Sequence, residues 1–152
     1  MGRLPCRYLT DAPIDVAELL RRVAGAEHGG VCTFLGTARR HSSGKEVVEL
    51  RYESYPQMAD EAIDGILRRV VERHPGVAID ALHRLGVCPI GEASVAVVAA
   101  AAHRDAAFAA CRMAIDEIKE LAPIWKQEVY RDGTAWIGDP SPPPAGAADR
   151  ER

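Results

Sequence analysis

The sequence predicts a fold of the α+β class. Segments with strand patterns and segments with helix patterns are mixed along the chain, and more than one pair of strand patterns is joined by a hairpin-like connection. These two observations favour α+β over a doubly wound parallel sheet, in which strands and helices alternate throughout. The chain has 152 residues and no internal repeat, so we expect one folded domain, at residues 1–138.

Seven segments have the β-branched, apolar or alternating composition that is typical of strands. In chain order they are residues 6–9, 31–39, 47–54, 77–85, 93–101, 124–130 and 134–137. Gly36, inside the second segment, indicates a bulge or a close approach of another group to the backbone. In the third segment, Val48, Leu50 and Tyr52 are expected to share one face, opposite the charged residues between them.

Turn and loop signals separate these strands. Residues 40–45 are small and polar and are expected to form a mobile loop, and Gly86 with residues 88–92 is expected to form a turn. Asp132-Gly133, between the last two segments, favours a hairpin with a type I′ turn. Residues 139–152 are rich in proline and charge, and we expect a disordered tail, because such a composition cannot bury a core.

Three segments have apolar residues at helical spacing, with start and stop signals at their ends. They begin near Asp15, at Pro56 and at Ala106, and they end at Gly25, at Pro75-Gly76 and at Ile118. The third segment is the clearest of these helices. It leads directly into the part of the chain where we expect a functional site.

The composition excludes several classes of function. A net charge of −3 argues against general nucleic-acid binding, so any site for an anion would be a local basic pocket. The four cysteines lack C-x-x-C spacing, and we expect neither a zinc site nor a disulfide framework, no other metal and no cofactor. The longest apolar run, residues 93–102, is too short to span a bilayer, and the N-terminus lacks the apolar core of a secretion signal. We therefore expect a cytoplasmic protein.

Residues 118–128 run off the end of the third helix, break at Pro123 and continue as an extended segment. Lys119 and Lys126 lie on either side of this break. Two clustered lysines repel each other, so a fold that keeps them together generally uses them on an anion or as acid–base groups. Two simpler interpretations stay open: Lys119 complements the helix dipole, and Lys126 is an ordinary surface residue of a strand.

Other basic residues also lie at the ends of predicted elements, where sites are generally built. His103-Arg104 precedes the third helix, and a helix N-terminus with a guanidinium and an imidazole can bind phosphate, although Asp105 is also placed to pair with Arg104. Arg39 follows a strand at the mouth of a loop. For His83-Arg84, inside a strand, we expect one side chain in solvent, the other on a neighbour, and no functional role. The pattern predicts a pocket for a small phosphorylated compound, with lysines as general acid and base.

The chain resembles the large, catalytic subunit of molybdopterin synthase in a set of motifs that follow the order of that family. The motifs cover about residues 5–138. The most specific is Pro-Ile-Trp-Lys at residues 123–126, after a helix that ends in lysine. The others are Phe34-Leu35-Gly36-Thr37-Ala38-Arg39, residues 50–59, His83-Arg84-Leu85-Gly86, Gly91-Glu92, Ala102-His103-Arg104, Gln127-Glu128 and Trp136.

The resemblance implies a reaction, in which two sulfurs pass to cyclic pyranopterin monophosphate and form the dithiolene of molybdopterin. The sulfur donor is the C-terminal Gly-Gly thiocarboxylate of a small ubiquitin-like carrier, whose tail enters the pocket. By similarity, the catalytic residues are Lys119, which lies beside the incoming thiocarboxylate, and Lys126, which helps to protonate or orient the pterin intermediate. By the same similarity, the substrate-binding residues are Thr37, Ala38, Arg39, His103, Arg104, Lys119, Lys126, Gln127 and Glu128.

The resemblance also implies the fold and the assembly. The fold is an α/β hammerhead with an additional antiparallel β subdomain. Two catalytic subunits form a central homodimer, the dimer partner contributes to each pocket, and a carrier at each end completes a heterotetramer. The chain departs from the family at Ala38, where a larger apolar residue is common, in the basic pair Arg40-His41 and in the tail from Pro140. Two alternatives stay open: a non-enzymatic module that binds a small phosphorylated ligand, and a lysine Schiff-base enzyme acting on a carbonyl phosphate.

Overall fold

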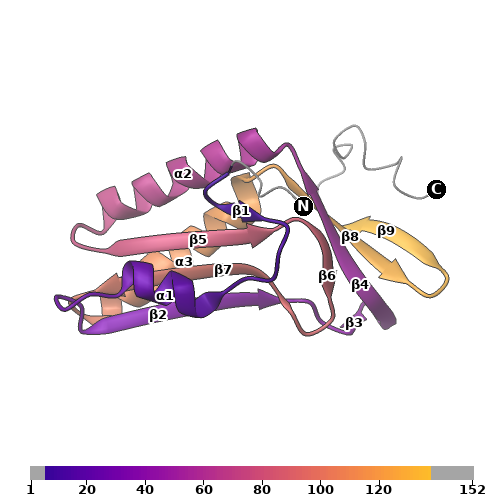
Figure 1. The fold of residues 1–152 in the computed structure, drawn as a ribbon, viewed down its shortest axis with the longest axis horizontal. Coiled ribbons are helices and arrows are strands. Elements are labelled where there is room, and N and C mark those ends of the chain that lie inside the picture. Colours follow the sequence, from indigo (N-terminus) through magenta and orange to yellow (C-terminus); the bar gives the residue numbers. More distant parts are fainter. Residues whose placement is uncertain (1–5, 138–152) are drawn as a thin grey trace.

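The computed structural model describes residues 6–137, which form strands and helices in mixed order (Figure 1). The strands are β1 (Leu9–Thr10), β2 (Gly30–Thr37), β3 (His41–Ser42), β4 (Lys45–Ser54), β5 (Ala78–Arg84), β6 (Gly86–Pro89), β7 (Ala93–Ala101), β8 (Ile124–Tyr130) and β9 (Gly133–Ile137). The helices are α1 (Val16–Val23), α2 (Pro56–Arg73) and α3 (Arg104–Leu121). The α+β prediction is confirmed. The predicted tail, residues 139–152, lies outside the described residues.

The first sheet has four strands in the order β1-β5-β7-β2, and it is antiparallel except where β1 runs parallel to β5. Side chains alternate between the two faces along β7, and helices cover both faces (Figure 1). Val95 and Val97 pack in one core with α2 and α3, whereas Val98 and Ala100 pack in another with α1. Burial on both faces explains why the β7 sequence is almost continuously apolar.

α3 lies close to this sheet because its inward residues are small. Ala107, Ala110 and Ala114 are almost fully buried in the core that α3 shares with β7. Its N-terminal end is approached closely by the residues that open β2, since a Cβ atom on Gly29 would lie 2.5 Å from the Ala102 carbonyl oxygen. Only glycine permits that approach. The close contact fixes the position of the turn before α3.

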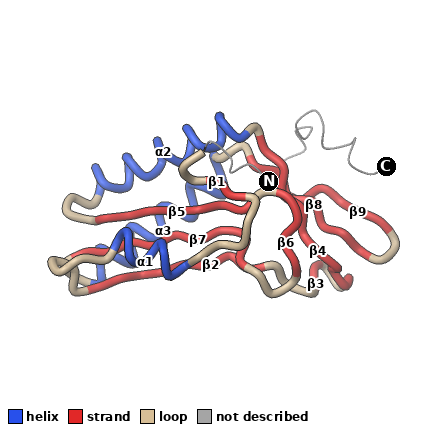
Figure 2. Tube along the Cα trace, in the orientation of Figure 1, coloured by secondary structure: helices blue, strands red, loops and turns tan. Residues whose placement is uncertain are grey.

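The second sheet contains β3, β4, β8 and β9 in that order, and β6 also pairs with β4 (Figure 2). β4 is antiparallel to β8, but their register shifts between Val47 and Glu49. The prediction that Val48, Leu50 and Tyr52 share one face is therefore wrong for Val48, which is 48% exposed, whereas the other two are buried. An extra residue at a bulge rotates the side chains that precede it.

Two segments that we expected to be irregular contain short strands. The predicted mobile loop at residues 40–45 includes β3, which returns to β4 through a turn with Ser43 and Gly44 at positive φ. The predicted turn at Gly86 and residues 88–92 includes β6, whose partner is β4. Neither segment has strong strand propensity, and pairing with a long neighbouring strand, which local sequence does not encode, decides its conformation.

The ends of two predicted elements also differ. The first strand begins at Leu9 rather than at residue 6, because the Tyr8 N–H donates a hydrogen bond to Asp60 on α2. The β8–β9 hairpin is confirmed, but the type I′ turn is wrong. Tyr130 pairs with Gly133, and the two residues between them do not have the positive φ that this turn requires.

The irregularity predicted at Gly36 is confirmed, because the register of β2 against β7 shifts between Gly36 and Thr37. A Cβ atom on Gly36 would lie 2.7 Å from Val95 Cγ1, which real side chains do not tolerate without a shift of their neighbours. Glycine therefore lets β2 stay close to β7 where the bulge occurs. In the described part of the chain, no helix combines the length and the apolarity that crossing a bilayer requires.

Candidate active site

A sharp chain reversal connects α3 to β8. The Ala122 N–H still donates to the Ile118 carbonyl, as in a helix, but Pro123 cannot continue the pattern and the Ile124 N–H donates to the Ala122 carbonyl instead. β8 then joins the second sheet through its pairing with β4. Lys119 belongs to the last turn of α3 and Lys126 is the third residue of β8, so the reversal places the two lysines on facing elements.

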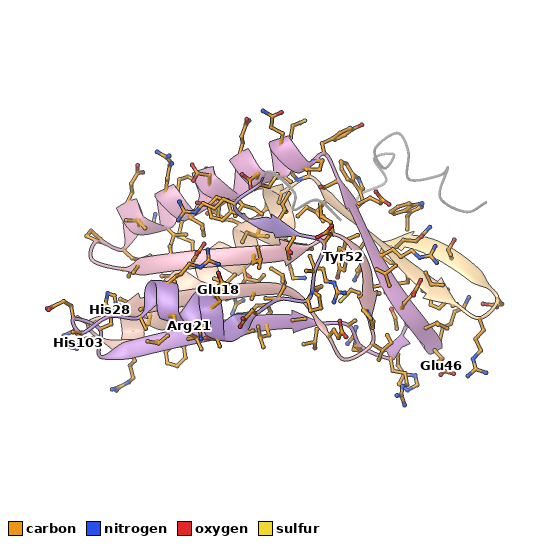
Figure 3. All side chains as sticks on the ribbon, viewed as in Figure 1. Glu18, Arg21, His28, Glu46, Tyr52 and His103 are labelled. Carbon is orange, nitrogen blue, oxygen red and sulfur yellow. The ribbon has the colours of Figure 1, made fainter. Side chains whose placement is uncertain are left out.

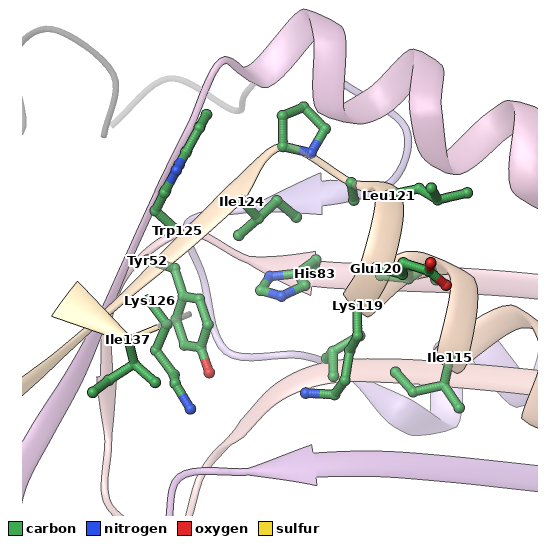
Figure 4. Close-up of a pocket in the computed structure, with 14 residues that line it drawn as sticks. Tyr52, His83, Ile115, Lys119, Glu120, Leu121, Ile124, Trp125, Lys126 and Ile137 are labelled. Carbon is green, nitrogen blue, oxygen red and sulfur yellow. The ribbon is translucent and has the colours of Figure 1, made fainter. Parts of the chain in front are cut away.

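The two lysines line one cavity of about 440 Å³. Figure 4 shows both amines directed into the same space, with the Tyr52 hydroxyl pointing towards it from β4. Apart from Glu120 at the end of α3, the cavity wall is otherwise largely apolar: Val95, Ile115, Ile118, Leu121, Ala122, Pro123, Ile124, Trp125 and Ile137, with His83 among them. The cavity is therefore a largely apolar hollow that holds two positive charges.

Burial and charge together lower the pKa of Lys119. Although Lys119 keeps contact with solvent, partial burial is the larger cause, and the positive charge of Lys126 is the second. Among residues 6–137, neither lysine donates a hydrogen bond to another side chain or forms an ion pair. Their donors are therefore free for a guest, and a larger fraction of Lys119 is a neutral amine at a given pH than for a lysine in water.

His83 and Tyr52 form the inner wall of the cavity, and here the sequence expectation is wrong. We expected one side chain of His83-Arg84 in solvent, but both residues are buried. Arg84 pairs with Glu92, and the His83 ring contacts the Tyr52 ring edge-on with centroids 5.0 Å apart. Burial, followed by the Lys119 charge, lowers the pKa of His83 to about 4, and burial raises the pKa of Tyr52. Both side chains are thus neutral near pH 7.

A second hollow of about 560 Å³ lies between β2 and α3. It shares Ile115 and Lys119 with the first cavity. Its other lining residues come from β2 and from the exposed side of α3: Cys32, Thr33, Phe34, Phe108, Cys111, Arg112 and Asp116. Lys119 therefore lines two neighbouring hollows, one between the two sheets and one at the β2 edge of the first sheet.

His103 and Arg104 lie at the opposite end of α3 from Lys119. Arg104 opens the helix and Lys119 is fifteen residues later, a separation of ~22 Å along the axis at 1.5 Å per residue. Figure 3 shows His103 at one end of the molecule and Tyr52, on the cavity wall, towards the other. A single chain therefore does not bring these two residues to the lysine cavity.

The remaining expected site residues have different environments. Thr37 and Arg39 are exposed near the end of β2. The Ala38 side chain is buried, and its N–H and carbonyl bond to the backbone of residues 91–92, so it can contribute to a site only through neighbouring residues. Gln127 and Glu128 are buried beside Lys126, and Tyr130 donates its hydroxyl hydrogen bond to the Glu128 carboxylate.

Tyr52 and His83 are polar lining residues for which no functional role was expected from the sequence. Tyr52 lies directly opposite Lys126 in the β4–β8 register. His83 points to the face of the first sheet that packs on α2 and α3, because alternate residues of β5 share a face and Ala81 belongs to that core. Alternation alone was available from the sequence, but the register between β4 and β8 was not. In the described residues, no group of three or more His, Cys, Asp or Glu side chains is arranged to hold a metal ion.

Comparisons with known proteins agree on one family. The family model described as MoaE protein matches residues 9–121. The chain is 41% identical over 138 residues to Molybdopterin synthase catalytic subunit 1 of Mycobacterium tuberculosis, covering 91% of this chain and 94% of that relative.

Two solved structures have a similar fold. The crystal structure of molybdopterin synthase from Staphylococcus aureus has a TM-score of 0.84 at 31% identity, over 87% of this chain and 96% of that chain. A protein–protein complex of subunits 1 and 2 of molybdopterin-converting factor from Helicobacter pylori has a TM-score of 0.72, over 94% and 97% of the chains. At 22% identity, the second likeness is one of fold alone.

Proposed function

The chain belongs to the MoaE protein family, and we propose from this premise that it is the catalytic subunit of a molybdopterin synthase. The reaction transfers two sulfurs from the C-terminal thiocarboxylate of a small ubiquitin-like carrier to cyclic pyranopterin monophosphate. The observation that carries the proposal is the cavity with two unpaired lysines at the junction of the sheets. Thiocarboxylate and phosphate are both anionic, and a local cationic cavity attracts them to a protein whose net charge is −3.

The two lysines take different roles in this proposal. Lys119 lies beside the incoming thiocarboxylate, and Lys126, across the cavity on β8, orients and protonates the pterin intermediate. The lowered pKa of Lys119 supports an acid–base role, because general catalysis is most effective when the pKa of the group is near the working pH. The apolar wall supports it further, since exclusion of water strengthens each charge interaction in the site.

We assign the carrier tail to the cavity between the sheets. An extended Gly-Gly tail needs a narrow entrance, and two large apolar side chains that line this cavity are exposed: Leu121 is 51% exposed and Ile137 40%. Exposed apolar residues around a cavity are typical of a protein-docking surface. The name of the Helicobacter pylori complex, subunits 1 and 2 of molybdopterin-converting factor, is consistent with a partner of this kind.

We assign the substrate phosphate to a pocket completed by a second copy of the chain. β2 is an edge strand of the first sheet, and its exposed apolar side chains continue onto α3: Val31, Phe34, Leu35 and Phe108. If two β2 edges face each other around a two-fold axis, the strands run in opposite directions. The first residues of α3 in one subunit then approach the last turn of α3 in the other, and His103 and Arg104 of the partner subunit can reach the hollow beside Lys119.

A reconstitution tests the proposed function. The protein is incubated with a thiocarboxylated carrier and cyclic pyranopterin monophosphate, and dithiolene formation is followed by conversion of the product to a fluorescent derivative. We expect product with wild-type protein, and a loss of about 10²–10⁴-fold with Lys119→Ala, the range for removal of a general acid–base group. Lys45→Ala, a matched change at an exposed lysine outside the cavity, should retain activity. Near-normal product formation by Lys119→Ala with the carrier in excess would exclude its catalytic role.

A further inference from the structure

His83 is a buried ring on the cavity wall that the proposed chemistry does not use. It is 7% exposed, it comes from β5, and it lines the cavity together with Lys119 and Lys126. Figure 4 shows its ring between Tyr52 and the last turn of α3, which carries Lys119. A histidine in such a place costs more desolvation than a leucine would, so its polar atoms need an explanation.

One nitrogen of the ring has a fixed role. His83 Nδ1 lies 2.8 Å from the Arg84 carbonyl oxygen. A carbonyl only accepts hydrogen bonds, so Nδ1 carries the hydrogen and donates it. In the neutral ring the other nitrogen, Nε2, is then an acceptor without a hydrogen. The edge-on contact with Tyr52, at 5.0 Å between centroids, fixes the plane of the ring.

The charges around the ring keep it neutral. The cations that face it are Lys119 from α3 and Lys126 from β8, the hydroxyl of Tyr52 comes from β4, and the Glu120 carboxylate lies at the outer end of the cavity. Burial and the Lys119 charge together lower the His83 pKa to about 4. Because this lies well below neutral pH, the ring stays neutral near pH 7 and offers Nε2 as a hydrogen-bond acceptor.

We propose that His83 is a positioning residue for Lys119, whose amine donates a hydrogen bond to Nε2 when it turns towards the sheet. Among the side chains that line the cavity, only Nε2, the Tyr52 hydroxyl and the Glu120 carboxylate can accept from an ammonium group. Glu120 is exposed and is directed away from the cavity in Figure 4. Nε2 thus gives the Lys119 amine a defined position beside the carrier tail. Lys126 lies on the opposite wall of the cavity, on β8. This assignment rests on the proposed function.

Two substitutions separate the two ring nitrogens. The amide of His83→Asn can occupy the place of Nδ1 and donate to the Arg84 carbonyl, but it has no group at Nε2. His83→Gln carries an acceptor close to Nε2 and loses the Nδ1 donor. Thermal unfolding of both variants and of wild type identifies any loss of fold before the comparison is made.

The first measurement does not depend on sulfur transfer. Acetic anhydride labels lysines only as neutral amines, so the labelling rate of Lys119 across a pH series, read by peptide mass spectrometry, gives its titration midpoint. Loss of an acceptor destabilises the ammonium form, and we expect the Lys119 midpoint to move to lower pH in His83→Asn and to stay near the wild-type midpoint in His83→Gln. The second measurement is product formation with the thiocarboxylated carrier, in which we expect His83→Asn to lose at least tenfold in kcat and His83→Gln to remain within about threefold of wild type.

Three outcomes would overturn the assignment. An active His83→Asn with an inactive His83→Gln would mean that only the bond to the Arg84 carbonyl matters. Equal losses in both variants, with an unchanged Lys119 midpoint, would mean that the ring acts by packing against Tyr52. A wild-type midpoint and wild-type activity in both variants would remove any role. If wild type forms no product but the midpoint moves in His83→Asn alone, the contact between His83 and Lys119 stands and the proposed function fails.

Discussion

The separation of Arg104 from Lys119 on one helix predicts a specific pattern of complementation between defective subunits. The two residues are ~22 Å apart along the axis of α3 at 1.5 Å per residue, so a substrate bound by both must lie between two chains. A heterodimer of a Lys119→Ala chain and an Arg104→Ala chain then contains one pocket with both residues intact and one pocket with neither. A heterodimer of a wild-type chain and a chain with both substitutions contains no intact pocket.

The expected magnitudes follow from this geometry. The Lys119→Ala homodimer should lose about 10²–10⁴-fold in activity. The Arg104→Ala homodimer loses a charge-assisted hydrogen bond to phosphate, about 1.5–3 kcal/mol, which is roughly 10–150-fold at low substrate concentration. The heterodimer of the two single variants should recover about half of the wild-type activity per dimer, and the heterodimer with the double variant should remain near the background of the homodimers.

The assay uses two affinity tags, so that each heterodimer is purified by two successive tag selections and then supplied with carrier and substrate. Product per dimer is compared with that of wild type carrying the same tags. The result that would refute the reasoning is the reverse pattern. If the heterodimer with the double variant retains half of the activity, while the other heterodimer stays at background, then Lys119 and Arg104 act within one chain.

Three further predictions concern the cavity and its supports. Lys126→Met removes a positive charge that lowers the pKa of Lys119, so the labelling midpoint of Lys119 should move to higher pH; an unchanged midpoint would show that burial alone causes the shift. Gly36→Val should destabilise the fold by ~1–3 kcal/mol in chemical denaturation, because its Cβ would lie 2.7 Å from a β7 side chain. Gly65→Ala, in a helix where the nearest atom to the new Cβ would be Arg69 Nη1 at 3.7 Å, should stabilise by ~0.5–1 kcal/mol. Equal effects of the two glycine changes would contradict this contact. The pKa of His83 is about 4 in the folded chain and its ordinary value is 6.5, so the unfolded chain binds the proton more tightly. The free energy of unfolding should therefore fall as the pH decreases from 6.5 to 4. The fall should be about 3 kcal/mol larger than in His83→Gln, which has no ring to protonate. Parallel pH–stability curves for the two proteins would contradict the neutral, buried ring.

Local sequence was sufficient for the elements and for one half of the site. The helical period before Pro123 and the extended pattern after it predicted a reversal between Lys119 and Lys126, and both lysines do line one cavity. A feature that depends only on neighbours in the chain, such as the end of a helix, can be predicted from a few adjacent residues.

The other half of the site depends on pairing between distant segments. Tyr52 reaches the cavity because β4 pairs with β8 in one particular register, and a bulge near Val48 alters that register. His83 is buried because it points from β5 to the face of the sheet where the core with α2 and α3 lies, and its sequence neighbours gave no indication of this. We expected Arg104 and the two lysines in one pocket. In the single chain, however, Arg104 lies at the other end of α3 from Lys119.

The cavity belongs to two sheets that meet at an angle, and this has a mechanical consequence. His83 and Lys119 move with the four-stranded sheet and its helices, whereas Tyr52 and Lys126 move with the other sheet. The distance between the two amines therefore depends on the angle between the two sheets. The chain passes directly between the sheets at Leu85, where β5 gives way to β6, and again at Ala122-Pro123. A substitution at Leu85 can alter how closely the two charges approach without changing any residue that lines the cavity, whereas Ala122 and Pro123 are lining residues themselves.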